Sequence, residues 1–355
     1  RQASGSIGLL LSLLVGDRGS LTNVPGPDTG SGGVLPGAGK RALPSCAVPP
    51  FVSVPADAPL RLLTVHAHPD DEASKGASTV AALHAGGVHC VLVCCTGGEA
   101  GDVLNPAMDV PEVHADLPAV RNAELAQAAE IIGYDEVIML GYRDSGMKDS
   151  DHNARPEAFA NADHDEAVGR LVAIIRRVRP QVIVTYPDAR GEYDHPDHVQ
   201  VHDISVPAFH AAGDPERYPE AGLIWQPSKL YYTMWSRARI AGLHAKFLEL
   251  EIESPYDEWW FERPSSDHLI TTQVPIADHW DVRGEALRAH ATQIDPASKF
   301  WFGLPDEAAR TVHPFDDYHL EACCLDGQPV DPVDFLTGGL IEDDLFAGVR
   351  AELNA

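Results

Sequence analysis

Short apolar runs alternate with segments of helical periodicity from residue 60 onward. Apolar runs of roughly four to eight residues between turn formers predict buried strands, and apolar residues three or four positions apart predict amphipathic helices. The expected strands are 62–65, 88–95, 136–140, 181–186 and 229–234. The expected helices are 74–84, 116–132, 166–178, 199–212, 236–250 and 277–294.

This alternation predicts βαβ units, and therefore a parallel sheet with right-handed crossovers. The 88–95 run is apolar at nearly every position, which indicates a strand covered on both faces. Glycines at 86–87 and 133 follow two of the helices, as is common at helix C-termini. We expect an α/β fold with a doubly wound, mostly parallel, Rossmann-like sheet and helices on both faces. A smaller C-terminal region is expected to cover the substrate.

The first 57 residues differ in composition from the rest, being rich in Gly, Pro and Ser with one apolar run at 7–15. That run is too short to span a bilayer, which needs about 20 residues. A signal peptide is the less favoured alternative, because Arg1 is the only basic residue before the run and no small-x-small cleavage site follows it. We expect residues 1–57 to be a disordered extension or a misplaced start, 58–325 to form the domain, and 326–355 to be an acidic tail.

The net charge of −27, from 26 Lys and Arg against 53 Asp and Glu, makes the surface strongly acidic. Such a surface repels nucleic-acid phosphates and anionic lipid headgroups, so we expect no nucleic-acid partner and no membrane partner. The six cysteines contain no Cys-x-x-Cys pair, and Cys90, Cys94 and Cys95 lie in the 88–95 strand. Buried thiols of this kind suit a reducing compartment, and we expect a cytoplasmic protein.

Titratable residues gather where two of the strands end. The 62–65 strand is followed by His66, His68, Asp70, Asp71 and Glu72. The loop after the 181–186 strand ends in a second group, Asp194, His195, Asp197 and His198. Loops at the carboxyl ends of strands form the ligand site of an open α/β sheet. We therefore expect both groups, with the loops 96–102 and 141–146, to meet in one site.

The residue types in these two groups indicate a metal site. His68 and Asp71 are three positions apart where the chain turns into a helix, so their side chains can share a face. His198, from the other loop, can complete a set of two imidazoles and one carboxylate. With a water in the fourth position, that set suits a catalytic Zn²⁺, which lowers the pKa of the bound water to about 7. The same ligands accept Fe²⁺, and we expect one ion per chain.

Attack of water on a carbonyl also requires a proton acceptor and stabilisation of the oxyanion. Asp70 is adjacent to Asp71 but should point in a different direction, which favours it as general base. His195 precedes His198 by three positions and, if protonated, can stabilise the oxyanion and protonate the leaving amine. Asp197 could orient His195 and balance its charge.

Other interpretations of the two motifs remain open. Each His-Pro-Asp could be only a helix N-cap, since Asp is favoured there and Pro suits the first turn. His68, Asp70 and the distant His195 also resemble the facial triad of non-haem iron oxygenases, although those are built on jelly rolls. A closed structural site usually has four protein ligands, often Cys, and no Cys lies near either motif. Two such motifs at strand-to-helix turns of one α/β chain favour the hydrolytic metal site.

The two motifs resemble those of the LmbE-like family of zinc-dependent N-deacetylases, related to the N-acetylglucosaminyl-phosphatidylinositol deacetylases. The family hallmarks stand here as residues 67–72 and 195–198, and the likeness runs from about residue 61 to 305. Within the family, the chain most resembles the amidases that act on mycothiol S-conjugates. The matching segments are 66–72, 75–76, 95–108, 225–227, 229–232, 236–239 and 253–256.

The resemblance implies roles for individual residues. It assigns the metal to His68, Asp71 and His198, the general base to Asp70, and the oxyanion-stabilising acid to His195.

Four further residues are assigned to the substrate. The resemblance implies that Tyr193 polarises the substrate carbonyl and that Arg121 and Asp144 hold hydroxyls of the glucosaminyl-inositol. Lys75, one helical turn after Asp71, can face the site and meet a polar part of the substrate, or it can be a solvated helix residue.

The implied activity is that of a cytoplasmic metal-dependent amidase in thiol-based detoxification. Its substrate would be a small-molecule pseudo-disaccharide thiol conjugate, cleaved to a mercapturic acid and glucosaminyl-inositol. The alternative is deacetylation of N-acetylglucosaminyl-inositol or of another N-acetylglucosamine derivative. The sequence does not predict the oligomeric state.

Overall fold

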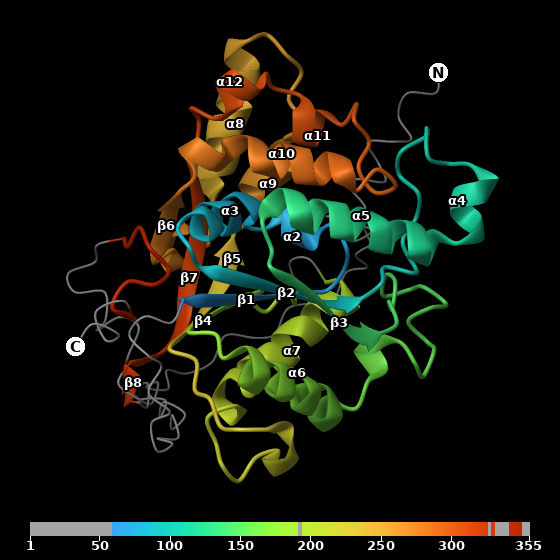
Figure 1. The fold of residues 1–355 in the computed structure, drawn as a ribbon. Coiled ribbons are helices and arrows are strands. Elements are labelled where there is room, and N and C mark those ends of the chain that lie inside the picture. Colours follow the sequence, from blue (N-terminus) through green and yellow to red (C-terminus); the bar gives the residue numbers. More distant parts are fainter. Residues whose placement is uncertain (1–58, 191–193, 326–327, 331–340, 350–355) are drawn as a thin grey trace, which may run out of the picture.

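The computed structural model describes residues 59–190, 194–325, 328–330 and 341–349. These residues form a sheet of eight strands with helices on both faces (Figure 1). The strand order is β3-β2-β1-β4-β5-β7-β6, and β8 pairs with β7. The predicted mostly parallel α/β fold is confirmed.

Five strands pair in parallel, and all five were predicted: β1 (Arg61–His66), β2 (His89–Thr96), β3 (Glu136–Tyr142), β4 (Val182–Thr185) and β5 (Lys229–Met234). Antiparallel pairing adds three strands that were not predicted: β6 (Thr272–Pro275), β7 (Phe315–Leu325) and β8 (Gln328–Val330).

The longer helices are α3 (Ala77–Ala85), α5 (Leu117–Ile132), α6 (His164–Val178), α7 (Pro196–Ala211), α8 (Arg237–Glu249) and α10 (Trp280–Ala289). The shorter ones are α2 (Asp71–Ser74), α4 (Pro111–Ala115), α9 (Glu258–Glu262), α11 (Lys299–Phe302) and α12 (Asp306–Ala309).

The helix predicted at 74–84 corresponds to α3, and a short helix, α2, precedes it. Gly76 separates them with a φ of +98°, a conformation that favours glycine. A Cβ at this position would lie 2.8 Å from the Tyr318 hydroxyl oxygen, so only glycine allows β7 to approach so closely. The predicted helix is therefore present, but it begins three residues later than predicted, because tertiary packing requires a break at Gly76.

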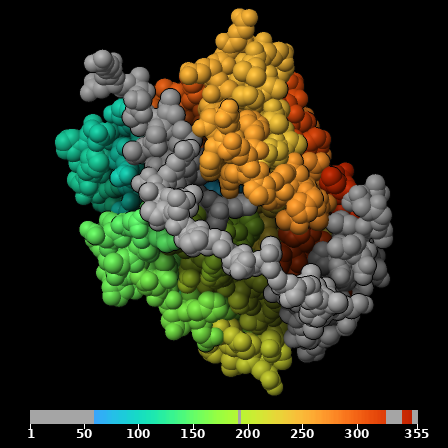
Figure 2. All heavy atoms as spheres, turned by 180° about the vertical axis from the view of Figure 1, so that it is seen from behind, coloured from blue at the N-terminus to red at the C-terminus, as the bar shows by residue number. Residues whose placement is uncertain are grey.

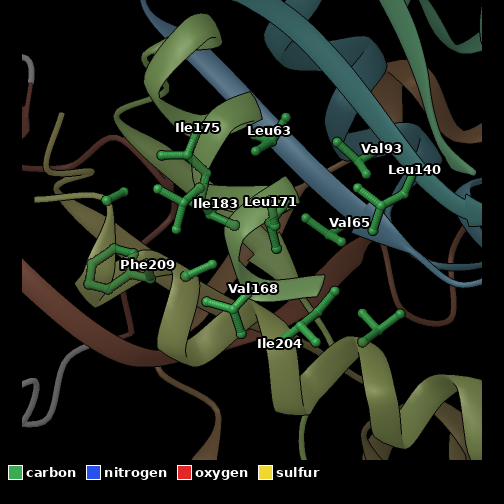
Figure 3. Packing of buried hydrophobic residues seen from close by; sticks show 14 of the residues in the cluster. Leu63, Val65, Val93, Leu140, Val168, Leu171, Ile175, Ile183, Ile204 and Phe209 are labelled. Atoms are coloured by element: carbon green, nitrogen blue, oxygen red, sulfur yellow. The ribbon is translucent and has the colours of Figure 1, made fainter. Parts of the chain in front are cut away.

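Two apolar layers cover the sheet, one on each face. Leu62 of β1 packs among residues of α3, α5 and α10, whereas Leu63 and Val65 pack among residues of α6 and α7. Successive residues of a strand point to opposite faces, which explains why every position of the central strands is apolar. Figure 3 shows the second layer, where side chains of α6 and α7 close on β1, β2 and β4.

The segment 341–349, which the sequence assigns to an acidic tail, returns to the sheet. The backbone N–H of Gln273 donates to the Glu342 carbonyl, and Leu345 and Phe346 are fully buried in the layer around α3 and α10. The acidic composition of this segment led us to predict a tail, although two of its side chains belong to the core.

The connectivity places a crevice between β1 and β4. β2 and β3 follow on one side of β1, and β4 and β5 lie on the other. The connections that leave the carboxyl ends of β1 and β4 therefore diverge, and ligands bind at such a switch point. The loop after β1 carries the first His-Asp motif and the loop after β4 opens α7 with the second.

The C-terminal region adds a hydrophobic cluster of aromatic and aliphatic side chains. Its buried members are Ile240, Phe247, Tyr256, Trp260 and Leu304. Seen from behind in Figure 2, the orange part of the chain that carries α9 stands above the yellow-green part that carries α7. Among the helices of the described ranges, none combines the length and the apolar character needed to cross a bilayer.

Replacing Phe209 with Ala should lower the free energy of unfolding by about 3–5 kcal/mol. Phe209 is fully buried between α7 and the sheet, and truncation leaves a cavity that the packed layer cannot fill. The matched control is Leu248→Ala, at a position 59% exposed, which should change stability by less than about 0.5 kcal/mol. Equal losses in urea denaturation of the two variants would contradict this placement of the core.

Candidate metal centre

The turn after β1 has an unusual backbone that buried groups hold in place. Asp70 adopts a φ of 114°, which is rare for a non-glycine residue and costs about 1–3 kcal/mol. Its backbone N–H donates to Glu72 Oε2 at 2.9 Å, and Glu72 Oε1 lies 2.5 Å from His290 Nε2. Glu72 and His290 are fully buried. His290, at the end of α10, therefore holds the turn that carries the first motif in place.

Three predicted ligands meet at one carboxylate oxygen. Asp71 Oδ2 lies 3.5 Å from His68 Nδ1 and 3.3 Å from His198 Nε2. Ligand atoms at about 2.0–2.2 Å from a tetrahedral ion are roughly 3.3–3.5 Å apart, so these separations fit a single Zn²⁺-sized cation. All three residues are buried, and their ligand atoms lie within 4.8 Å of one another. The donor set can hold a metal ion.

The ligand atoms of a second set, His68, His195 and Asp197, also lie within 4.8 Å of one another. The Asp197 carboxylate, however, accepts hydrogen bonds from both the backbone N–H and the hydroxyl of Ser145. It also lies 3.1 Å from His68 Nε2, the nitrogen opposite the one that faces Asp71. A carboxylate that receives the outer N–H of a ligating imidazole is common around metals. We therefore interpret Asp197 as the partner of His68 and Asp71 as the ligand.

Lys75 is bound to the other oxygen of the ligand carboxylate. Its Nζ lies 2.5 Å from Asp71 Oδ1, which leaves Oδ2 facing the two imidazoles. Burial alone would raise the pKa of Asp71, but His198 and Lys75 hold it well below its usual value. Lys75 directly follows α2 and faces the site, where it keeps Asp71 ionised, and its contact with substrate stays a prediction.

The surrounding carboxylates make the site favourable for a cation. Burial alone would lower the pKa of His68, but Asp144 and Asp197 outweigh burial and raise the pKa well above its usual value. Buried charges of one sign require a compensating charge. A divalent ion among these side chains would supply it.

Asp70 points to the cavity and is held by Arg121. Arg121 Nη2 donates to Asp70 Oδ2 at 3.0 Å and to the Pro69 carbonyl at 2.6 Å, and Nη1 donates to the Gly98 carbonyl. Burial raises the pKa of Asp70 to about 6, and Arg121 opposes this rise. Arg121 therefore orients the expected base. Its contact with substrate hydroxyls stays a prediction.

His195 is the N-cap of α7, and its ring faces that of His68. Its ring centroid is 4.6 Å from that of His68, and its Nδ1 accepts the backbone N–H of Asp197 at 3.2 Å. A nitrogen that accepts a hydrogen bond carries no proton, so the ring is neutral with its proton on Nε2. Burial and the nearby His68 also hold the pKa of His195 well below its usual value. The Asp197 carboxylate contacts His68, and the expected roles of His195 as the oxyanion-stabilising acid and of Asp197 as its partner stay predictions.

Asp144 reaches the site from the end of β3. Its Oδ1 lies 3.5 Å from His68 Nε2 and accepts the backbone N–H of Gly146 at 2.7 Å. Its Oδ2 accepts the backbone N–H of Ala100, so Asp144 joins two of the converging loops. The predicted role of Asp144 in substrate binding stays a prediction. Tyr193 lies outside the described residues.

Three residues in this network were missed or left unassigned by the sequence interpretation. Glu72 belongs to the first motif, but only its contact with His290 reveals that it fixes the turn. His290 and Ser145 stand alone in polar stretches without a recognisable motif. Glu72 lies 218 positions from His290, and Asp197 lies 52 positions from Ser145, so no local sequence pattern could predict these contacts.

The predicted metal ligands and the charged residues around them line one side of a cavity of about 370 Å³. The polar lining is His68, Asp70, Asp71, Ser74, Lys75, Asp102, Arg121, Asp144, His195, His198, Arg263 and Gln293. The remaining lining is mostly apolar and includes Leu104, Met147, Trp235, Trp260, Leu287, Ile294, Phe300 and Trp301. A small molecule that enters it therefore meets the two imidazoles, the paired carboxylate and Asp70 together.

The chain belongs to the GlcNAc-PI de-N-acetylase family, PIG-L. The sequence profile of this family matches residues 63–209, which extend from β1 through most of α7 and contain both His-Asp motifs. The family expected from the two motifs is therefore confirmed.

The chain is also similar to individual members over almost their whole length. A mycothiol S-conjugate amidase of Streptomyces coelicolor is 43% identical over 300 residues, which cover 82% of this chain and 98% of the relative. A 1D-myo-inositol 2-acetamido-2-deoxy-alpha-D-glucopyranoside deacetylase of Geodermatophilus obscurus is 39% identical over 304 residues, with coverage of 81% and 98%. The expected likeness to the amidase subgroup is confirmed.

Among solved structures, N,N'-diacetylchitobiose deacetylase from Pyrococcus horikoshii superimposes with a TM-score of 0.52. The match covers 75% of this chain and 85% of that protein, at 17% sequence identity. This likeness supports the fold.

Replacing His198 with Ala should remove the metal, whereas replacing His195 with Ala should leave it in place. Changes to outer partners of metal ligands cost about 10–100-fold in affinity, so loss of a ligand should cost more than ~100-fold. Metal content per chain after dialysis against a weak chelator measures both. The exposed His114→Ala serves as control for the handling of histidine variants. Retention by His198→Ala together with loss by His195→Ala would favour the competing ligand set.

Proposed function

We propose that the chain is a metal-dependent amidase acting on mycothiol S-conjugates. It would hydrolyse the amide that joins an S-substituted N-acetylcysteine to glucosaminyl-inositol, releasing a mercapturic acid and the amino-sugar inositol. The observation that carries the proposal is the convergence of His68, Asp71 and His198 beside Asp70 in one cavity. The 43% identity to a mycothiol S-conjugate amidase supports the choice of substrate.

The ligand set fits Zn²⁺, with Fe²⁺ as the alternative. Held by His68, Asp71 and His198, such an ion would act as a Lewis acid on the amide carbonyl and on water. Lys75 keeps the Asp71 carboxylate ionised through its outer oxygen, and Asp197 fixes the ring of His68. These two residues prepare the site without touching the reacting atoms.

Asp70 is the proton acceptor for the attacking water. A carbon–oxygen bond forms at the carbonyl as Asp70 takes the proton, and the proton then passes to the amide nitrogen as the carbon–nitrogen bond breaks. Arg121 holds one oxygen of Asp70 at 3.0 Å and thereby aims the carboxylate. His195 accepts the backbone N–H of Asp197 at Nδ1, which leaves its Nε2–H to donate a hydrogen bond to the oxyanion.

The second candidate is deacetylation of N-acetylglucosaminyl-inositol, supported by the 39% identity to such a deacetylase. Both reactions release the same amino sugar and differ only in the acyl group, which is acetyl in one and S-substituted N-acetylcysteinyl in the other. The higher identity to the amidase, 43% against 39%, favours the larger acyl group. The cytoplasmic setting stays a prediction from the thiols of β2.

Replacing Asp70 with Asn should lower kcat by about 10²–10⁴-fold while metal content stays unchanged, because the amide side chain cannot accept the proton. Release of free amine from a conjugate measures the rate. Asp194→Asn is the matched control, since Asp194 is exposed and pairs with Lys148. Undiminished turnover in Asp70→Asn would exclude Asp70 as base.

Metal-loaded protein should cleave a mycothiol S-conjugate with a kcat/KM at least about tenfold higher than that for N-acetylglucosaminyl-inositol, since one interaction of about 1.4 kcal/mol suffices for that ratio. Amine release from equal concentrations of both substrates gives the comparison. A higher kcat/KM for N-acetylglucosaminyl-inositol would replace the amidase with the deacetylase.

A further inference from the structure

The cavity has two unlike walls. One carries the ligand set with Asp70, Lys75, Arg121 and Asp144. The other is formed by four aromatic side chains, which we name the aromatic wall: Trp235, Trp260, Phe300 and Trp301. A polar hydrolytic site requires the first wall, whereas nothing in the hydrolysis of an amide requires the second.

The aromatic wall is assembled from three separate segments. Trp235 follows β5, Trp260 lies on α9, and Phe300 and Trp301 lie on α11. Trp235 and Phe300 stack with centroids 5.9 Å apart at 9°, and Trp260 stacks on Phe300 at 5.9 Å and 30°. Trp301 meets Phe300 edge-on at 4.8 Å. The rings hold one another in place, so the wall is formed before a ligand binds.

Side chains behind the wall add to its rigidity. The Arg239 guanidinium lies 4.9 Å from the Trp235 ring centre, and Tyr256 contacts Trp260 edge-on at 5.5 Å. Apolar lining with a few placed polar groups is typical of small-molecule sites. A preformed aromatic surface of this kind favours a planar, apolar occupant.

The proposed substrate has two parts that correspond to the two walls. Its glucosaminyl-inositol part carries hydroxyls, which suit the carboxylates and cations of the polar wall. Its S-substituent comes from an electrophile and varies between conjugates. Both walls line the same cavity, and the scissile amide lies between the two parts of the substrate, so one part can extend toward each wall.

On the basis of the proposed amidase function, we propose that the aromatic wall is the subsite for the S-substituent. It selects conjugates whose sulfur carries a planar apolar group, and it binds this group by stacking and by removal of apolar surface from water. A stacking site tolerates many ring systems, since it reads a flat face and not a pattern of hydrogen bonds.

The test compares two conjugates that share the sugar and differ at sulfur, one carrying bimane and one carrying methyl. Wild-type protein should cleave the bimane conjugate with a kcat/KM roughly 10–100-fold higher. Trp260→Ala and Trp301→Ala should each reduce this preference at least tenfold, mostly through loss of activity on the bimane conjugate. Phe261→Ala is the matched control, because Phe261 also lies on α9 but packs against His244 and does not line the cavity.

Equal losses on both conjugates in the Trp variants would overturn the proposal, because they would place the rings against the shared sugar. An unchanged preference would overturn it as well. Cleavage of neither conjugate by wild-type protein that deacetylates N-acetylglucosaminyl-inositol would instead reject the proposed function, and the subsite with it.

A second measurement uses wild-type protein alone and does not depend on how the variants fold. The bimane mercapturic acid should inhibit at least tenfold more strongly than S-methyl-N-acetylcysteine, because it retains the group that stacks on the wall. Equal inhibition by the two acids would contradict the subsite.

Discussion

The structure depends on one carboxylate oxygen that two imidazoles share. Asp71 Oδ2 lies 3.5 Å from His68 Nδ1 and 3.3 Å from His198 Nε2. Along the chain, β2, β3 and β4 lie between the two histidines. Only the pairing of β1 with β4 brings the two turns together. The topology of the sheet thus sets the distance between the ligands, and the ligand atoms fit a single cation between them.

Partners within the chain balance three of the carboxylates of the site. Lys75 pairs with the outer oxygen of Asp71, and Arg121 pairs with Asp70. Glu72 and His290 form a fully buried pair that also fixes the turn at Asp70. Removing one member of such a pair leaves an uncompensated charge, which costs more than the pair itself contributes. The same contacts orient the site and keep it folded.

Much of this arrangement could be predicted from the sequence, because the hydrophobic pattern indicates the strands and the position of the motifs at strand ends indicates the site. The central strands are apolar throughout, and both motifs stand where strands end, so the parallel sheet and the ligand set followed directly. β7 escaped prediction because it contains Asp316 and Asp317, which read as surface residues. Both are buried, with Asp316 paired to Arg283 and Asp317 bonded to Ser236 and His313.

The partners of the site could not be predicted for a related reason. The sequence suggested that Asp197 serves its neighbour His195, but the fold turns that carboxylate to His68, 129 positions away. Contacts over such separations arise from packing and leave no local pattern.

The most direct test of the shared metal site is anomalous diffraction from crystals of the zinc-loaded protein. We predict one peak within about 2.0–2.2 Å of His68 Nδ1, Asp71 Oδ2 and His198 Nε2. A peak coordinated instead by His195 and Asp197, or no peak in this crevice, would contradict the account.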